Sequence, residues 1–220
     1  MKRSVIIVAG GKGARMGGDL PKQFLPLNGK PVLMHTLDVF YRWDSSAGIL
    51  LVIPEEHESY WSMLCREIGC KIPHRIIYGG ETRFHSVQNA IRELDGDCIA
   101  AVHDGVRPFV GCDVISACFA IAEEYGAAIP VVAMTESVRM IDGGQSRPLD
   151  RNRICTVQTP QVFRAELLRQ AYGRSYDAQF TDDASLVEAA GYAVRLVDGN
   201  RENIKITTPM DLRYAEIMMT

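Results

Sequence analysis

The feature that most constrains the fold is an alternation of two kinds of segment between residues 4 and 134. Short continuous apolar runs, typical of strands buried on both faces, are SVIIVAG, GILLVIP, HRIIYGG, DCIAAVHD and GAAIPVVAM. Between them lie segments with helical spacing, namely PVLMHTLDVFYRW, EEHESYWSMLCREIG, ETRFHSVQNAIREL and CDVISACFAIAEEYG. Strands that alternate with helices pair through right-handed crossovers into a mostly parallel sheet. The sequence therefore predicts an α/β fold of the Rossmann-like type, with a sheet flanked by helices.

The alternation stops at Thr135, where the polar stretch TESVRMIDGGQSRPLDRNRICT begins. Within it, DGG is a hairpin-type turn between two short extended pieces. We expect a protruding β-arm at about residues 135–156, inserted into a single domain that spans residues 1–220. After VFRAELLRQAYG, we expect a helix starting near TDDASLVEAAG, a strand in AVRLVDG, a late strand in NIKITTP and a closing helix.

Composition excludes several classes of function. The net charge of -3 gives no reason to expect nucleic-acid or membrane-surface binding. The apolar stretch at residues 5–9 is too short for a signal peptide or a membrane span. The six cysteines lack CxxC spacing and are expected to be buried free thiols, which makes the cytoplasm the default location.

The loop after the first expected strand, GGKGARMGGDLPKQF, is rich in glycine and stands at the usual phosphate site of a doubly wound sheet. It lacks the Gly-Lys pair followed by Ser or Thr that a Walker loop needs. It also fails the dinucleotide fingerprint, because Gly11 and Gly13 are followed by Met16 at the third glycine position. What remains is a long loop that delivers Arg15 and Lys22, either to an anion or merely to solvent.

Six motifs in order then carry a resemblance to a known family. GGKGARM followed by PKQF resembles the signature of sugar-nucleotide and polyol-phosphate nucleotidyltransferases. GGETRFHSV, HDGVRPF, DRNRICTVQTPQVF, TDDASLVEAAG and ENIKITTPMDL resemble the 2-C-methyl-D-erythritol 4-phosphate cytidylyltransferases of non-mevalonate isoprenoid biosynthesis, over essentially the whole chain. The resemblance implies transfer of a cytidylyl group from CTP to 2-C-methyl-D-erythritol 4-phosphate, with release of pyrophosphate and formation of 4-diphosphocytidyl-2-C-methyl-D-erythritol.

This chemistry asks for cations rather than a general base, because the attacking phosphate is already an anion. The resemblance implies catalytic roles for Arg15, Lys22 and Lys205, the last at the end of the late strand. It implies that the CTP phosphates lie in a cradle of Ala9, Gly10, Gly11 and Gly13, and the cytosine against Gly80, Glu81 and Ser86. We expect Thr82 to cap the following helix and Arg83 to hold the same loop in place.

Asp104, at the carboxyl end of an apolar strand, is placed to serve Mg²⁺, directly or through the outer shell. The neighbouring Arg107 is expected either to form a salt bridge or to bind the second substrate, and His103 is expected to be a core residue. Thr181 and Asp182 are expected mainly to cap a helix.

The resemblance further implies that Ser137, Arg151 and Thr159 contact the methylerythritol phosphate, with the arms of two subunits interlocked in a homodimer. The sequence departs from the family pattern at two places. Glu136–Ser137 replaces the usual Asp-Thr or Asp-Ser pair, and Gly105 replaces the more frequent alanine.

Other functions are weighed against this one. A ribitol 5-phosphate cytidylyltransferase would share the fold, the nucleotide and the cations, but DRNR with Arg151 and TDDASLVEAAG favour methylerythritol phosphate. A silent nucleotide-binding module would not need Arg15, Lys22 and Lys205 at one phosphate. Met16 disfavours a nicotinamide-dependent oxidoreductase. Strictness for CTP over UTP does not follow from the residues.

Overall fold

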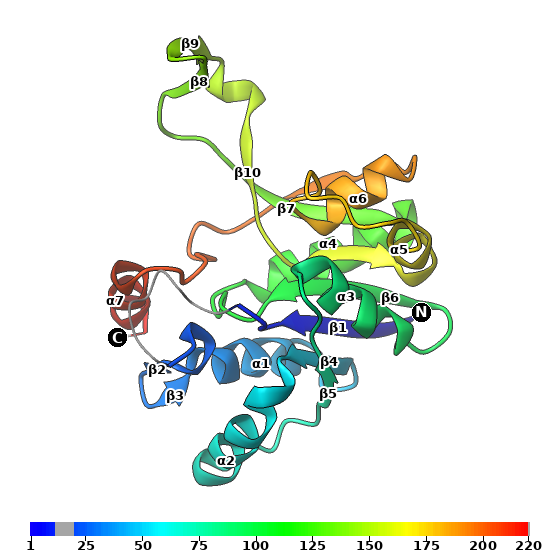
Figure 1. Cartoon of the computed structure of the whole chain (residues 1–220), viewed down its shortest axis with the longest axis vertical. Helices are drawn as coiled ribbons and strands as arrows, with labels where there is room; N and C mark the ends of the chain where they lie inside the picture. Colours follow the sequence, from blue (N-terminus) through cyan, green and yellow to red (C-terminus); the bar gives the residue numbers. More distant parts are fainter. Residues whose placement is uncertain (12–19, 220) are drawn as a thin grey trace.

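The computed structural model describes residues 1–11 and 20–219 (Figure 1). Within them, the centre is an eight-stranded sheet in the order β10-β7-β11-β6-β1-β4-β5, with β12 paired to β7. The strands are β1 (Lys2–Val8), β4 (Gly48–Ile53), β5 (Arg75–Tyr78), β6 (Cys98–Asp104), β7 (Ala127–Ala133), β10 (Cys155–Val157), β11 (Gln161–Arg164) and β12 (Arg195–Asp198). β1 pairs in parallel with β4 and β6, β4 with β5, and β7 with β12. The predicted α/β class with a mostly parallel sheet is confirmed.

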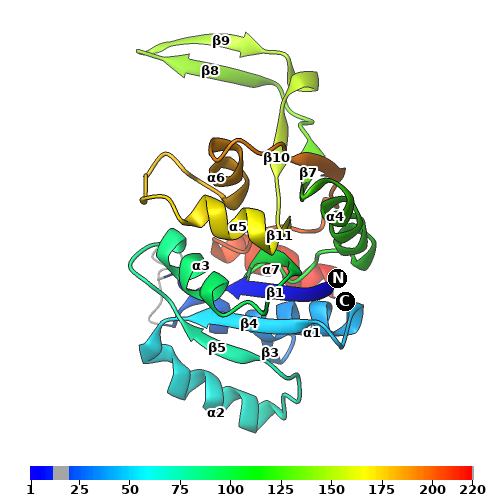
Figure 2. The same cartoon turned by 90° about the vertical axis from the view of Figure 1, so that its right-hand side faces the viewer.

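Helices cover both faces of this sheet (Figure 2). They are α1 (Val32–Trp43), α2 (Glu58–Ile68), α3 (Arg83–Arg92), α4 (Cys112–Tyr125), α5 (Ala165–Tyr172), α6 (Asp183–Ala189) and α7 (Pro209–Met218). Side chains alternate along β1, so that Val5 and Ile7 join the core under α1, α2 and α4, whereas Ile6 joins the core under α3, α5 and α6. A third, smaller cluster holds α7 against β2 (Pro26–Leu27), which forms a short hairpin with β3 (Lys30–Pro31).

The ends of β1 and β6 meet at one edge of the sheet. Val8 pairs with Asp104, and Gly105 N donates to Val8 O at 2.8 Å. A Cβ on Gly105 would lie only 2.9 Å from the Ala9 Cβ and 3.0 Å from Leu33 Cδ1. The glycine that departs from the family pattern therefore fits the tight crossing of these two loops.

The expected arm is a hairpin of β8 (Val138–Asp142) and β9 (Gln145–Leu149) that extends away from the sheet (Figure 1). Gly143 and Gly144 both have positive φ, 52° and 84°, as a two-residue hairpin turn requires. Most side chains of the hairpin are exposed, Ile141 by 79%.

The structure corrects three expectations about strands. The short β11 was not predicted; it runs antiparallel between β6 and β7, and its four residues lead directly into α5, so periodicity cannot separate them. NIKITTP is not a strand, because it makes a single ladder-like bond, from Ile206 N to Val106 O at 3.0 Å. β5 is not buried on both faces: it pairs only with β4, and Arg75 and Tyr78 are exposed.

All six cysteines are free, as expected. Cys98 and Cys118 are buried. Cys112 is exposed, because it is the first residue of α4 and lies at the N-terminal end of that helix. Cys65, Cys70 and Cys155 are half-buried. Across residues 1–11 and 20–219, every helix is too short or too polar to span a membrane.

Candidate active site

A cavity of about 210 Å³, here called the β1–β6 cavity, opens where β1 and β6 end. Its walls are the loop after β1, the short helix η2 (Lys22–Phe24), the loop before α3, the end of β6 and the segment before α7. Of the residues predicted for catalysis and nucleotide binding, it brings together Ala9, Gly10, Gly11, Lys22, Gly80, Glu81, Ser86, Asp104 and Lys205. These residues come from five separate parts of the chain.

Lys22 is positioned by the residue that follows it. Gln23 is buried, and its Nε2 donates to Ala9 O at 2.8 Å, which ties η2 to the end of β1. The Lys22 Cε lies 3.6 Å from the place that a Cβ on Gly11 would occupy. The lysine and the glycine loop are therefore neighbours in one wall, where backbone N–H groups and an ammonium group can act on one anion.

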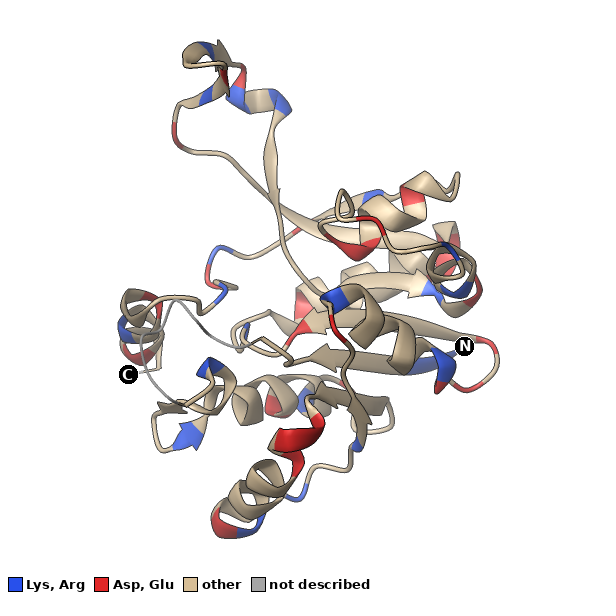
Figure 3. Ribbon diagram, in the orientation of Figure 1, with Lys and Arg blue, Asp and Glu red and all other residues tan. Residues whose placement is uncertain are grey.

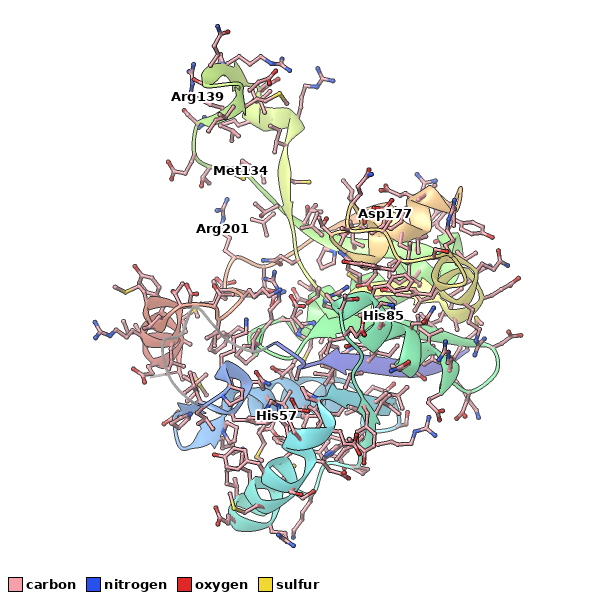
Figure 4. All side chains as sticks on the ribbon, viewed as in Figure 1. His57, His85, Met134, Arg139, Asp177 and Arg201 are labelled. Carbon is pink, nitrogen blue, oxygen red and sulfur yellow. The ribbon has the colours of Figure 1, made fainter. Side chains whose placement is uncertain are left out.

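Aromatic packing anchors η2 from its other end. Phe24 is buried and meets His57, Tyr60 and Trp61 at ring-centroid distances of 5.3–6.2 Å. His57, directly before α2, is labelled in Figure 4. Trp61 is itself fixed, since its Nε1 donates to His74 Nε2 at 2.9 Å. The turn that carries the predicted catalytic lysine is thus built into the core below it.

The loop before α3 is closed by its own hydrogen bonds. Gly80 N donates to Ser86 Oγ at 3.0 Å, and Ser86 Oγ donates to Thr82 O at 2.9 Å. Thr82 caps α3 as expected, and His85, at the start of that helix, is labelled in Figure 4. A side chain on Gly80 would collide with the Cβ of His85. Because the Ser86 hydroxyl already accepts one hydrogen bond and donates another within the loop, its first role is to shape the wall of the cavity. Glu81, in the same loop, is exposed.

Asp104 is the charge centre of the site. Its Oδ2 accepts from Arg107 Nε and from Lys205 Nζ, each at 3.1 Å. Burial acts to raise the pKa of Asp104, but Lys205, Arg83 and Arg107 together hold that pKa well below its usual range. The carboxylate is therefore ionised, and it holds Lys205, whose side chain is 42% exposed, at the mouth of the cavity.

A chain of hydrogen bonds fixes Asp104 from behind. Asp104 N donates to Thr159 Oγ1 at 3.1 Å, and Thr159 Oγ1 lies 3.1 Å from His103 Nδ1. His103 Nε2 lies 3.0 Å from Arg107 O, which can only accept, so we assign the proton to Nε2. Burial lowers the pKa of His103 to about 4. The expected core histidine is confirmed as a neutral, fully buried bridge.

A second cavity of about 260 Å³, here called the Thr159 cavity, adjoins the first and shares Arg83, Asp104 and Lys205 with it. It contains two of the residues predicted for the second substrate, Arg107 and Thr159. Arg107 is largely buried, and besides Asp104 it donates through Nη1 to Asn203 O at 2.8 Å. The expected salt bridge of Arg107 is therefore present.

Arg83 is held by a buried partner. Its Nη1 and Nη2 donate to the two carboxylate oxygens of Asp183 at 2.9 and 2.6 Å, and Tyr172 donates its hydroxyl to Asp183 at 2.5 Å. The Asp183 side chain is fully buried. Burial would lower the pKa of Arg83, but Asp183 more than offsets it, so the guanidinium group stays charged. This pair joins α3, which bears one wall of the β1–β6 cavity, to α6.

Two of the predicted residues, Gly13 and Arg15, lie outside the described residues, and two others are not gathered in these cavities. Ser137 and Arg151 lie in the arm, are exposed, and line neither the β1–β6 cavity nor the Thr159 cavity. Arg151 donates to Thr135 O at 2.8 Å within the arm. Lys and Arg side chains recur along this arm (Figure 3).

The predicted Mg²⁺ site can be tested on its donors. In residues 1–11 and 20–219, no group of three or more His, Cys, Asp and Glu side chains could hold a metal ion. Asp104 offers an ionised carboxylate in the buried floor of the β1–β6 cavity, and Mg²⁺ commonly combines one or two carboxylates with substrate phosphates. The residues therefore fit Mg²⁺ only when a nucleotide supplies further oxygen ligands.

Sequence reasoning missed three positioning residues. Gln23 stands in the quoted PKQF motif but received no role. Asp183 was not paired with Arg83, because the two are 100 residues apart. Asn203, which is fully buried and donates to Thr159 O at 2.8 Å, was hidden in a segment read as a strand.

Comparisons with known proteins agree with this geometry. The model of the family described as IspD, 2-C-methyl-D-erythritol 4-phosphate cytidylyltransferase, matches residues 4–220. The protein of that name from Bacteroides thetaiotaomicron is 53% identical over 219 residues, which cover 100% of both chains.

Two solved structures share the fold. One is 4-diphosphocytidyl-2C-methyl-D-erythritol synthase from Anaerococcus prevotii, with a TM-score of 0.84, 28% identity and coverage of 99% of this chain and 96% of that one. The other is the 2-C-methyl-D-erythritol 4-phosphate cytidylyltransferase from Francisella tularensis, with a TM-score of 0.82, 33% identity and coverage of 99% of each chain. The chain belongs to the 2-C-methyl-D-erythritol 4-phosphate cytidylyltransferase family.

Proposed function

We propose that the chain transfers a cytidylyl group from CTP to 2-C-methyl-D-erythritol 4-phosphate in non-mevalonate isoprenoid biosynthesis, giving 4-diphosphocytidyl-2-C-methyl-D-erythritol and pyrophosphate. One observation carries the proposal. Lys22, Lys205 and the Gly10–Gly11 backbone line one cavity, and the Thr159 cavity beside it shares Asp104, Arg83 and Lys205. Two adjoining anion-binding cavities with cations between them suit the approach of one phosphate to another.

In this mechanism a phosphate oxygen of the acceptor attacks the α-phosphorus of CTP, and the bond to pyrophosphate breaks. Lys22 and Lys205 stabilise the negative charge that develops on the α-phosphoryl and the leaving group, and Arg15 is proposed to join them. Gly10, Gly11 and Ala9 offer backbone groups to the triphosphate, and the loop at Gly80 and Glu81 faces the base. No side chain has to remove a proton.

Asp104 is proposed to hold Mg²⁺ together with the nucleotide phosphates, and the bound ion would neutralise phosphate charge. Asp104 also orients Lys205 through their 3.1 Å ion pair. Arg107 acts mainly by fixing Asp104, since it is largely buried and bonded to both Asp104 and Asn203. The Thr159 hydroxyl accepts from the backbone N–H of Asp104 and so fixes that residue. Thr159 also lines the Thr159 cavity, in which the acceptor is proposed to bind.

Ser137 and Arg151 are proposed to complete the acceptor site of a second copy, in a homodimer joined through the arms. The exposed apolar tip of the arm, with Met140 at 42% and Ile141 at 79% exposure, favours such docking. We further propose that the chain is one domain with the arm as an insertion. Six free cysteines are in keeping with a reducing compartment such as the cytoplasm.

Ribitol 5-phosphate is not favoured as the acceptor, because the family model and the relatives named above all carry the name of the methylerythritol phosphate or its cytidylyl product. The experiment supplies the purified chain with Mg²⁺, methylerythritol 4-phosphate and each of the four ribonucleoside triphosphates, and measures pyrophosphate. We expect release with CTP and little with UTP, ATP or GTP. Release that requires no acceptor, or that another nucleotide supports as well as CTP, would contradict the proposal.

A further inference from the structure

The end of α2 places two cysteines in a motif that usually holds an apolar pair. Gly69 follows the helix in the left-handed conformation, φ 74° and ψ 38°, and Cys70 N donates to Cys65 O at 2.9 Å. This bond from the second residue past the helix to its fourth-last residue defines a Schellman motif, in which the side chains of those two positions meet. Here both positions are cysteines. Helix α2 lies at the bottom of Figure 1, at the opposite end of the molecule from the arm.

The Schellman motif brings the two side chains together and leaves them within reach of solvent. Both are half-buried against the core under α1 and α2. The other half-buried cysteine, Cys155, lies in β10 at the base of the arm, and Cys112 is exposed at the start of α4. Among the described residues only the α2 pair therefore combines a neighbouring thiol with partial exposure.

The surroundings favour the thiolate form of Cys70 and the thiol form of Cys65. The hydrogen bond from the Cys65 thiol lowers the pKa of Cys70 to about 6, burial opposes this, and the backbone of Ile72 adds to the lowering. The same contact raises the pKa of Cys65. His74 also adds to the lowering of the pKa of Cys70. Asp38, from α1, acts in the opposite direction.

We infer that Cys65 and Cys70 form a redox-active dithiol that small disulfides oxidise to an intrachain disulfide. In the first step the Cys70 thiolate attacks one sulfur of the disulfide RSSR and displaces RS⁻, which leaves a mixed disulfide on Cys70. Cys65 then attacks the Cys70 sulfur and displaces the second RS⁻. In sum, two protein thiols lose two electrons and two protons, and RSSR becomes two RSH. This chemistry is independent of cytidylyl transfer.

The test uses the full-length protein, reduced and then equilibrated with reduced and oxidised glutathione in varied ratios. Remaining thiols are blocked with iodoacetamide, and the protein is digested with trypsin. Arg42, Arg66 and Lys71 separate the two cysteines into peptides 43–66 and 67–71. The inferred disulfide therefore appears as these two peptides joined, and it must revert with dithiothreitol.

We expect the joined peptides to increase with the oxidised share of glutathione, while Cys98 and Cys118 stay reduced. Cys112→Ser is the matched control and should leave the joined peptides unchanged. Cys70→Ser should abolish them and leave Cys65 open to alkylation. Glutathione attached singly to Cys65 or Cys70 with no joined peptides, or a pair that stays fully alkylated in oxidised glutathione, would overturn the inference.

Discussion

The body of the site and the arm differ in how their polar side chains are held. In the body, Asp104 has two ion pairs and a backbone bond to Thr159; Arg107 and Thr159 are largely buried, and only Lys205 among these partners reaches solvent. In the arm, Arg151 is exposed, and the side-chain hydrogen bond that it makes goes to the backbone oxygen of Thr135 within the arm. The body is therefore preorganised without a ligand, whereas the arm gains a defined environment only against something else. In the proposed reaction, the preorganised body binds the nucleotide, whereas the residues of the arm contact the acceptor.

The largest effect is expected for Lys22→Ala. If the body supplies transition-state stabilisation, kcat should fall about 100-fold or more, as when one fixed donor is removed from an oxyanion site. The dissociation constant of CTP should change much less. Steady-state kinetics and calorimetric CTP titration measure the two quantities. Lys30→Ala is the matched control, since Lys30 is paired with Asp38 outside the cavity and should behave like the parent. An equal loss in binding and turnover would make Lys22 a ground-state anchor.

Asp183→Asn probes how much of the body's order depends on one buried pair. The change leaves the charged Arg83 without its partner, which should lower the free energy of unfolding by about 3 kcal/mol. This value is at the low end for broken buried ion pairs, because the Arg83 side chain is 32% exposed. Denaturant titration measures it. Glu188→Gln, an exposed change on the same helix, should cost nothing measurable. Equal stability of the two variants would contradict the assigned role of Asp183.

His103 gives the body of the site a pH-dependent stability. Its pKa is lowered from 6.5 to about 4 in the folded state, so between these pH values the unfolded chain binds more protons. Stability should therefore fall as the pH drops from about 6.5 towards 4, by about 2 kcal/mol between pH 6.5 and 5. His103→Gln should flatten this part of the profile in denaturant titrations at several pH values. A slope that persists in the variant would assign it to other groups.

The smallest effect is expected in the arm. Arg151→Ala should raise the KM for methylerythritol 4-phosphate about tenfold, equivalent to one lost charged contact, and leave CTP binding unchanged. Mixing this variant with Lys22→Ala tests whether the arm serves a partner. Mixed dimers then contain one intact site, so activity at low acceptor concentration should recover. If the arm served its own subunit, every site would keep one defect and no recovery would occur.

The sequence predicted the parts of the molecule whose signals are local. Continuous apolar runs and helical spacing were enough for the helices and the strands of the central sheet through β7, but not for the short hairpin of β2 and β3. Thr82 and Asp182 were recognised as caps because a capping side chain bonds within three residues. β11 escaped prediction because its four residues merge with α5. Lys205 was assigned to a strand, although Asp104, far away in the sequence, holds it in a loop. Contacts of this kind, like Arg83 with Asp183, arise only when the sheet brings its carboxyl ends together.

The most direct test of the account is a competition between two acceptors in one vessel. The purified chain is given CTP, Mg²⁺ and equal concentrations of methylerythritol 4-phosphate and ribitol 5-phosphate, and the cytidylyl products are identified by mass spectrometry as they form. The account predicts that almost all early product is 4-diphosphocytidyl-2-C-methyl-D-erythritol, with one pyrophosphate for each molecule formed. Equal amounts of the two products, or an excess of the ribitol product, would contradict it.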